Sequence, residues 1–163
     1  MSPPNSTVAL ARPRTVRDNL AMTPTSTSSP AAADRVWART GLLVTSAALV
    51  VLVLAQASLA GQALFNEGDI GLHGIFGNVS FALGLAAAIF AGLGRVPRWL
   101  LAVSALTLAC LFGQTGLGYA GRESLDAATW HIPLGVAIFG LATVQLMGAI
   151  GLVRSPAGRS SLA

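Results

Sequence analysis

Four long apolar runs dominate the pattern of hydrophobic and polar positions along the 163-residue chain. Each run reaches the roughly 20 residues that a helix needs to cross a hydrocarbon layer about 30 Å thick. Lipid offers no partner for backbone N–H and C=O groups, so the runs are expected to be α-helices. The sequence therefore predicts an all-α membrane protein with transmembrane spans at residues 41–64, 70–93, 99–119 and 127–153.

Short polar connections separate the runs and predict how the helices are arranged. They centre on residues 66–69, 94–98 and 120–126. Connections this short place consecutive helices side by side and antiparallel. The predicted architecture is an up-down-up-down four-helix bundle over residues 35–153.

The segments that flank this domain are polar. Residues 1–34 are rich in Ser, Thr, Pro and Ala, a composition that buries too little apolar surface to offset its ordering entropy. We expect a disordered cytoplasmic tail there and a second, short cytoplasmic tail at 154–163. A shorter tail that begins at Met22 would be equally compatible with the predicted bundle, so the pattern does not decide between Met1 and Met22 as the first residue.

Charge adds a predicted orientation. The chain is 53% hydrophobic and 10% charged, which is too apolar for a soluble domain. Its basic residues are all Arg and are scattered singly, so no basic patch for nucleic acid is formed. One side of the predicted bundle carries Arg35, Arg39, Arg95, Arg98, Arg154 and Arg159, and the other carries Arg122 with Glu67, Asp69, Glu123 and Asp126. Because positive charge is retained in the cytoplasm, both termini are predicted to be cytoplasmic in a bacterial plasma membrane.

A competing interpretation treats the first run as a cleaved secretory signal, with small residues at Ala55-Gln56-Ala57. It would leave three spans. The run is longer than a usual signal core, and an internal repeat gives it a partner, so four spans are favoured. Cys110, the single cysteine, lies inside an apolar run and is predicted to be a small core residue.

An ungapped internal repeat relates the two halves of the domain at an offset of 58 residues. It superposes Gln56 on Gln114, Leu59 on Leu117, His73 on His131, Gly77 on Gly135, Phe81 on Phe139 and Leu83 on Leu141. Repeats in membrane proteins commonly place a site at the interface between the copies. Because the second and fourth helices run in the same direction, the two histidines should lie at one depth near the external surface, with the two glutamines close to that level.

The two histidines, which are the only ones in the chain, suit the role of ligands. Each lies near the start of its helix, where the positive end of the dipole disfavours imidazolium and keeps the ring in its neutral, coordinating form. One turn further on, a glycine removes side-chain bulk below each ring and would leave room for a flat macrocycle. We therefore predict one haem b, with His73 and His131 as metal ligands and a site completed by Gly77, Gly135, Gln56 and Gln114.

Simpler interpretations stay open. A histidine costs little near the headgroups, glycine is common in membrane helices, and glutamines can join helices through hydrogen bonds. A duplicated ancestor would also leave matching residues with no present use. Copper or a quinone is another occupant that a pair of histidines could serve.

Other polar residues have two interpretations each. Asp69 and Asp126 could orient the rings, but we favour helix N-caps. Arg122 could pair with a haem propionate, although a lone loop arginine is more often solvated. Asn78 and Gln145, which lie inside spans, are expected to hydrogen-bond to neighbouring helices.

The same residues carry a resemblance. The segment of about residues 55–148 resembles a family of small bacterial four-helix membrane proteins of unknown function, through Gln56-Ala-Ser-Leu-Ala-Gly61, Leu72-His73 before Gly77, and Trp130-His131-Ile-Pro133 before Gly135. It is similar, more distantly, to one half of haem A synthase, a four-helix bundle whose second and fourth helices each carry a histidine that serves a haem. The resemblance implies that His73 and His131 are an axial pair. Haem A synthase has two such bundles and a carboxylate close before a ligand histidine; this chain has one bundle, so oxidation of a haem methyl group is not implied.

Together these observations predict a haem protein for electron transfer or haem handling, because two imidazoles saturate the iron. The sequence has no nucleophile beside a base and no phosphate-binding glycine loop, so we do not predict an enzyme. The expected partners are the lipid bilayer and a membrane redox partner or quinone, and the sequence does not indicate an oligomeric state. The alternative is a non-catalytic membrane subunit or scaffold with no cofactor. A small transporter is less favoured because the charged residues stay at the surfaces.

Overall fold

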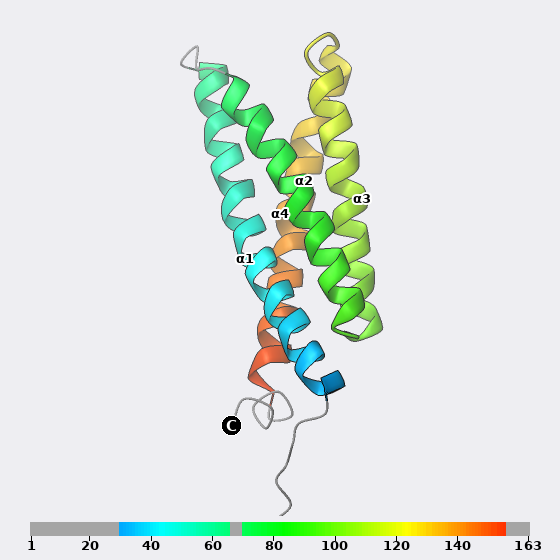
Figure 1. Cartoon of the computed structure of the whole chain (residues 1–163). Coiled ribbons are helices and arrows are strands. Elements are labelled where there is room, and N and C mark those ends of the chain that lie inside the picture. Colours follow the sequence, from blue (N-terminus) through cyan, green and yellow to red (C-terminus); the bar gives the residue numbers. More distant parts are fainter. Residues whose placement is uncertain (1–29, 66–69, 156–163) are drawn as a thin grey trace, which may run out of the picture.

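The computed structural model describes residues 30–65 and 70–155, and every regular element in those ranges is an α-helix (Figure 1). The helices are α1 (Pro30–Phe65), α2 (Ile70–Leu93), α3 (Arg98–Ala120) and α4 (Leu125–Arg154). All four are long and apolar enough to cross a membrane. The predicted all-α class and the four spans are confirmed, and the chain is a multi-pass membrane protein.

Only α1 departs clearly from its predicted span. It begins at Pro30 rather than near residue 41, and proline suits the first turn of a helix because the N–H that it lacks would have no partner there.

Some predictions concern residues that the structure does not describe. Residues 1–29 of the predicted tail, Glu67, Asp69 and Arg159 lie outside the described residues.

The helices form a ring in which each one packs against two antiparallel neighbours (Figure 1). α1 contacts α2 and α4, and α3 contacts the same two helices. α2 and α4 therefore lie diagonally across the ring and run in the same direction, as do α1 and α3. The predicted up-down-up-down bundle is confirmed.

The two ends of the bundle differ in the residues that they carry. At the lower end in Figure 1, α1 begins, α4 ends, and α2 turns into α3. We call it the arginine end because it carries Arg35, Arg39, Arg95, Arg98 and Arg154. The opposite end, where α2 and α4 begin, is the histidine end.

Local signals set the helix boundaries. Pro97 immediately precedes α3, and Arg95 adopts φ 47°, a left-handed conformation that tightens the turn after α2. Ser124 is the N-cap of α4, where its hydroxyl accepts a hydrogen bond from Ala127 N at 3.4 Å. The prediction that Asp126 is this N-cap is wrong. Asp126 lies in the first turn instead, where its negative charge favourably meets the helix dipole.

Buried side chains are confined to the part of the bundle nearer the arginine end. One cluster joins Leu42, Ala87, Ala91, Val96, Leu100 and Ala149, and a second joins Leu49, Leu111, Ile138 and Ala142. The buried residues closest to the histidine end are Leu49, Ser80, Leu111 and Ile138. We call the part up to these four residues the arginine half and the remainder the histidine half. No described residue of the histidine half is buried.

The buried positions repeat at the offset found in the sequence. The recurring pairs include Leu42 and Leu100, Ser46 and Ser104, and Ala91 and Ala149. Matching helices thus turn the same face inward, and the α1–α2 and α3–α4 pairs are two copies of one packing unit. This confirms the predicted construction from two helix-pair repeats.

Small and polar residues let the helices approach closely in the arginine half. Leu111 of α3 packs against α2 at Gly84, where any Cβ would overlap the leucine side chain. Gln145 Nε2 donates to Ser46 Oγ at 2.9 Å, and both residues are buried. The predicted interhelical hydrogen bond of Gln145 is therefore confirmed, and it joins α4 to α1.

Candidate functional site

His73 of α2 and His131 of α4 face each other across the bundle. Their ring centroids lie 5.9 Å apart and their planes are inclined by 63°. Two imidazoles that share one metal place their coordinating nitrogens about 4 Å apart, because each metal–nitrogen bond is about 2 Å long. The ring centroids of such a pair then lie about 6 Å apart. The centroid separation of the half-buried histidines is compatible with a shared metal and equally with an ordinary edge-to-face contact between rings.

Gln56 of α1 contacts His73 through its backbone and its side chain. Its backbone oxygen lies 3.3 Å from His73 Nδ1. The Gln56 carboxamide is oriented so that both of its terminal atoms have hydrogen-bond partners. Its nitrogen donates to His73 O at 2.8 Å and lies 3.0 Å from His73 Nδ1, and its oxygen accepts from Gly77 N at 3.0 Å. If Nδ1 carries the proton, it donates to the Gln56 backbone carbonyl and leaves Nε2 with the free lone pair that binds a metal. If Nδ1 instead accepts from the Gln56 carboxamide nitrogen, the proton is on Nε2.

The second glutamine occupies the equivalent place in the second copy. Gln114 Nε2 lies 3.1 Å from the position that a Cβ would take at Gly135, and the Gln56 carboxamide lies 3.5 Å from the corresponding position at Gly77. The space that each glycine leaves is therefore filled by a carboxamide, not left open below the ring as expected for a macrocycle. The repeated Gln, His and Gly have a common physical reason, since each glutamine docks on the helical turn that begins at the histidine.

The two copies differ in how their polar atoms are satisfied. His131 Nδ1 and Gln114 Oε1 are buried and make no well-aligned hydrogen bond within the described ranges; the nearest partner of the His131 ring is the backbone of Gln114. A buried polar atom without a partner costs about 1–3 kcal/mol. His131 also lies against α3 at Gly118, where a Cβ would come within 3.1 Å of the ring Cε1. The second copy therefore has unmet polar groups close to a tightly placed ring.

Arg122 extends from the α3–α4 loop toward the first turn of α2. Its guanidinium carbon lies 5.4 Å from the centroid of the Tyr119 ring, a cation–π contact. One of its terminal nitrogens lies 3.4 Å from the position of a Cβ at Gly74, the residue that follows His73. Asn78 Nδ2 donates to Tyr119 Oη at 3.3 Å, which confirms the predicted interhelical bond of Asn78. The guanidinium is thus held near the histidine pair.

Three residues around the histidines were not identified from the sequence: Gly74, Gly118 and Tyr119. The repeat gave no signal for the two glycines, because it pairs Gly74 with Ile132 and Gly118 with Ala60. Tyr119 is the only tyrosine in the chain, and this rarity was its one available signal.

The remaining candidates do not extend the site. Cys110 is half-buried and packs against the cluster that contains Leu111. Asp126 is exposed. Across residues 30–65 and 70–155, no three His, Cys, Asp or Glu side chains form a group that could hold a metal ion. Among the described residues, the arrangement therefore offers two imidazoles.

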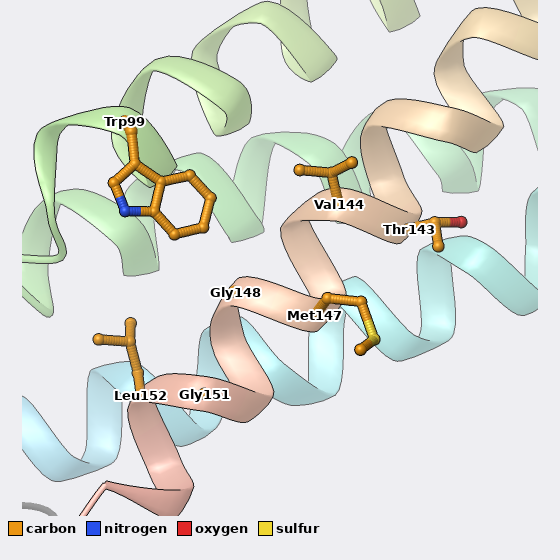
Figure 2. A pocket seen from close by; sticks show the side chains of 7 residues that line it. All are labelled: Trp99, Thr143, Val144, Met147, Gly148, Gly151 and Leu152. Carbon is orange, nitrogen blue, oxygen red and sulfur yellow. The ribbon is translucent and has the colours of Figure 1, made fainter.

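An apolar hollow lies elsewhere, in the arginine half on the outer side of α3 and α4 (Figure 2). It has a volume of about 520 Å³ and is lined by Trp99, Thr143, Val144, Met147, Gly148, Gly151 and Leu152. Several of these side chains are exposed, so the hollow opens on the surface that faces lipid. None of the candidate ligands lines it.

Comparison with known proteins gives a match to part of the chain. Residues 56–120 match the family of unknown function DUF6220. The match runs from Gln56 in α1 to the end of α3, so it includes His73 and excludes His131. No curated protein and no solved structure matches the chain.

Proposed function

We propose that this membrane protein binds one haem b between His73 and His131 and uses it for electron transfer or haem handling. The observation that carries the proposal is the pair of imidazole rings that face each other at 5.9 Å across the bundle.

The ligand set favours haem over a bare metal ion. Haem iron takes four nitrogens from its macrocycle and two axial ligands from the protein. Zinc and copper sites usually use three or four protein ligands, and the described residues offer no third ligand beside the two histidines.

The surroundings of the rings limit where an additional group would lie. The buried Nδ1 of His131 and Oε1 of Gln114 make no well-aligned hydrogen bond in the part of the chain that the structure describes. No described residue of the histidine half is buried, so no packed side chain closes this part of the bundle. The space at Gly77 and Gly135 is already filled by the glutamine carboxamides. The proposed place for the macrocycle is therefore between the two rings.

The chain's own residues would set the properties of this site. A bound haem supplies one-electron redox chemistry, and two imidazoles leave no open iron position for oxygen. With haem iron on Nε2, Nδ1–H of His73 would donate to the Gln56 backbone carbonyl, and this bond would raise the basicity of Nε2. Gly118 lets the His131 ring lie close to α3.

The proposed orientation follows from the arginines. Five of the six described arginines are at the arginine end, and the sixth is Arg122. The retention of positive charge in the cytoplasm places the arginine end inside and the histidine pair near the external surface of a bacterial plasma membrane. A membrane redox partner or a quinone would then meet the site from the external side.

Purification of the full chain from haem-replete cells tests the proposal. We expect a Soret band with the spectrum of low-spin, six-coordinate haem, and loss of that spectrum in His73→Ala and in His131→Ala. Free imidazole added to His131→Gly should restore the low-spin spectrum. A Ser46→Ala variant, altered only in the arginine half, should keep the wild-type band. A colourless wild-type protein, or a band unchanged in both alanine variants, would refute the proposal.

A cofactor-free membrane scaffold is the second candidate, and the apolar hollow favours it. Gly148 and Gly151 line the hollow, and small residues let a neighbouring helix approach closely. A scaffold would be colourless, would co-purify with a membrane partner, and would tolerate both histidine substitutions. The absorption spectrum of the purified protein therefore separates the two candidates.

A further inference from the structure

Arg122 is the one described basic residue at the histidine end, and no described carboxylate there forms an ion pair with it. The other described arginines lie at the arginine end. The interactions of the Arg122 side chain within the described ranges are with the face of Tyr119 and with α2 beside Gly74, and no carboxylate pairs with it. Its five N–H donors are therefore available for an anion.

The position of the guanidinium is restrained by its neighbours. Asn78 of α2 holds the hydroxyl of Tyr119, and the tyrosine ring in turn lies under Arg122. Gly74, without a side chain, lets the guanidinium lie against the helical turn that contains His73. The cation is thus placed against the start of α2, beside the residue that follows His73, although Arg122 itself is an exposed loop residue.

We infer that Arg122 binds a haem propionate and so holds the haem with its acidic edge toward the histidine end. The inference rests on the proposed haem site. A guanidinium binds a carboxylate through two parallel N–H···O bonds, a geometry that fixes orientation as well as adding affinity. Both propionates lie on one edge of the macrocycle, so one arginine is enough to define which edge faces outward.

The orientation has a consequence for how the haem is reached. With the propionates at the histidine end, the acidic edge meets the aqueous phase while the apolar edge points toward the packed arginine half. Electron exchange or haem transfer would therefore take place at the histidine end, close to Arg122 and Tyr119.

Reconstitution with two haems tests the inference. The full-length apoprotein in nanodiscs is titrated with haem b and with haem b dimethyl ester, whose propionates carry no charge, and the Soret band reports affinity. We expect wild type to prefer haem b over the ester by about tenfold. Arg122→Gln should bind haem b about fivefold to tenfold more weakly and bind the ester as wild type does. High salt should reduce the wild-type preference because the pair is near the surface.

Two further variants sharpen the test. Arg122→Lys keeps the charge without the two-pronged geometry and should keep part of the preference. Arg98→Gln removes the same charge at the arginine end and should behave as wild type. Equal affinities of wild type and Arg122→Gln for haem b would overturn the inference, as would equal weakening for both haems, while the histidine site would stand. A wild-type protein that binds neither haem would overturn the haem site and this inference together.

Discussion

The arginine half of the bundle is closed by buried side chains, whereas the histidine half, made by the same four helices, has none among the described residues. Both halves follow the same internal repeat, so helix number and direction do not explain the difference. Residue type does. In the arginine half, leucines such as Leu42 and Leu100 pack against alanines such as Ala91 and Ala149. In the histidine half, the inward positions are taken by histidine, glutamine and glycine.

This difference indicates a division of roles. Between membrane helices the lipid supplies no hydrophobic drive, so association depends on close van der Waals packing and interhelical hydrogen bonds. Such packing is concentrated in the arginine half, which therefore fixes the positions of all four helices. The histidine half inherits those positions and can hold polar side chains apart across the ring. Substitutions in one half should accordingly affect stability, and substitutions in the other should affect ligand binding.

The largest effect on stability is expected from Gly84→Ala in the arginine half. The new methyl group would overlap the buried Leu111 side chain, and overpacking of this kind costs about 1–3 kcal/mol. SDS titration in mixed micelles measures the free energy of unfolding. Gly92→Ala on the same helix is the control, because nothing lies within 4 Å of its Cβ position, and it should gain up to about 1 kcal/mol from helix propensity. Equal stabilities would show that α2 and α3 are not closely packed here.

The next effect is expected on ligand binding, from Gly118→Ala in the histidine half. Its Cβ would lie 3.1 Å from His131 Cε1, so the ring must shift by a few tenths of an ångström away from α3. We expect haem affinity to fall about threefold to tenfold, less than the roughly 10–100-fold typical of removing a group that supports a ligand, because the ring is only displaced. The free energy of unfolding of the apoprotein should be little changed. Gly116→Ala, which has open space, should retain wild-type affinity. A larger loss in the Gly116 variant would contradict the contact.

A smaller change in stability is expected from Ser46→Ala. The substitution removes the acceptor of Gln145 Nε2, and polar contacts between membrane helices contribute roughly 0.6–1.7 kcal/mol. The unfolding free energy should fall by that amount, while the Soret band of the haem-loaded protein should keep its position. A shifted band with unchanged stability would reverse the proposed roles of the two halves.

The smallest effect is expected from Asn78→Ala. Its bond to Tyr119 Oη is 3.3 Å long and exposed, so its loss should cost about 0.5 kcal/mol of stability or less. If Asn78 positions the tyrosine under Arg122, the same variant should show a reduced preference for haem b over its dimethyl ester. An unchanged preference would mean that Tyr119 holds Arg122 without this bond.

The fold was readable from the sequence because membrane spans follow from length and hydropathy. The short connections fixed the antiparallel order, and the 58-residue repeat predicted two equivalent helix pairs. The structure extends the repeat to Ser46 and Ser104, which are both buried. The boundary of α1 was less accessible, since a polar helical turn before a membrane span has no apolar pattern. Asp126 was misassigned as a cap because Ser124, two residues earlier, competes for the same role.

The site was readable only in part. The repeat identified His73 and His131, and their approach to 5.9 Å agrees with the expectation of a common depth. Depth, however, does not give the rotation of each helix about its axis, and that rotation decides which residues surround the rings. Gly118 beside His131 depends on it, and so does the docking of glutamine carboxamides on Gly77 and Gly135. These contacts join residues that no local pattern connects.

The duplicated helix pair has a consequence for biogenesis. Each pair carries a single imidazole, so neither can present two opposing donors until it has docked on the other. A chain that has inserted all four spans, but whose two helix pairs have not yet docked, would be unable to retain a ligand that requires both imidazoles. Pigmentation of the protein would in that case report completed assembly in the bilayer, and an insertion intermediate would be recognised by its lack of colour.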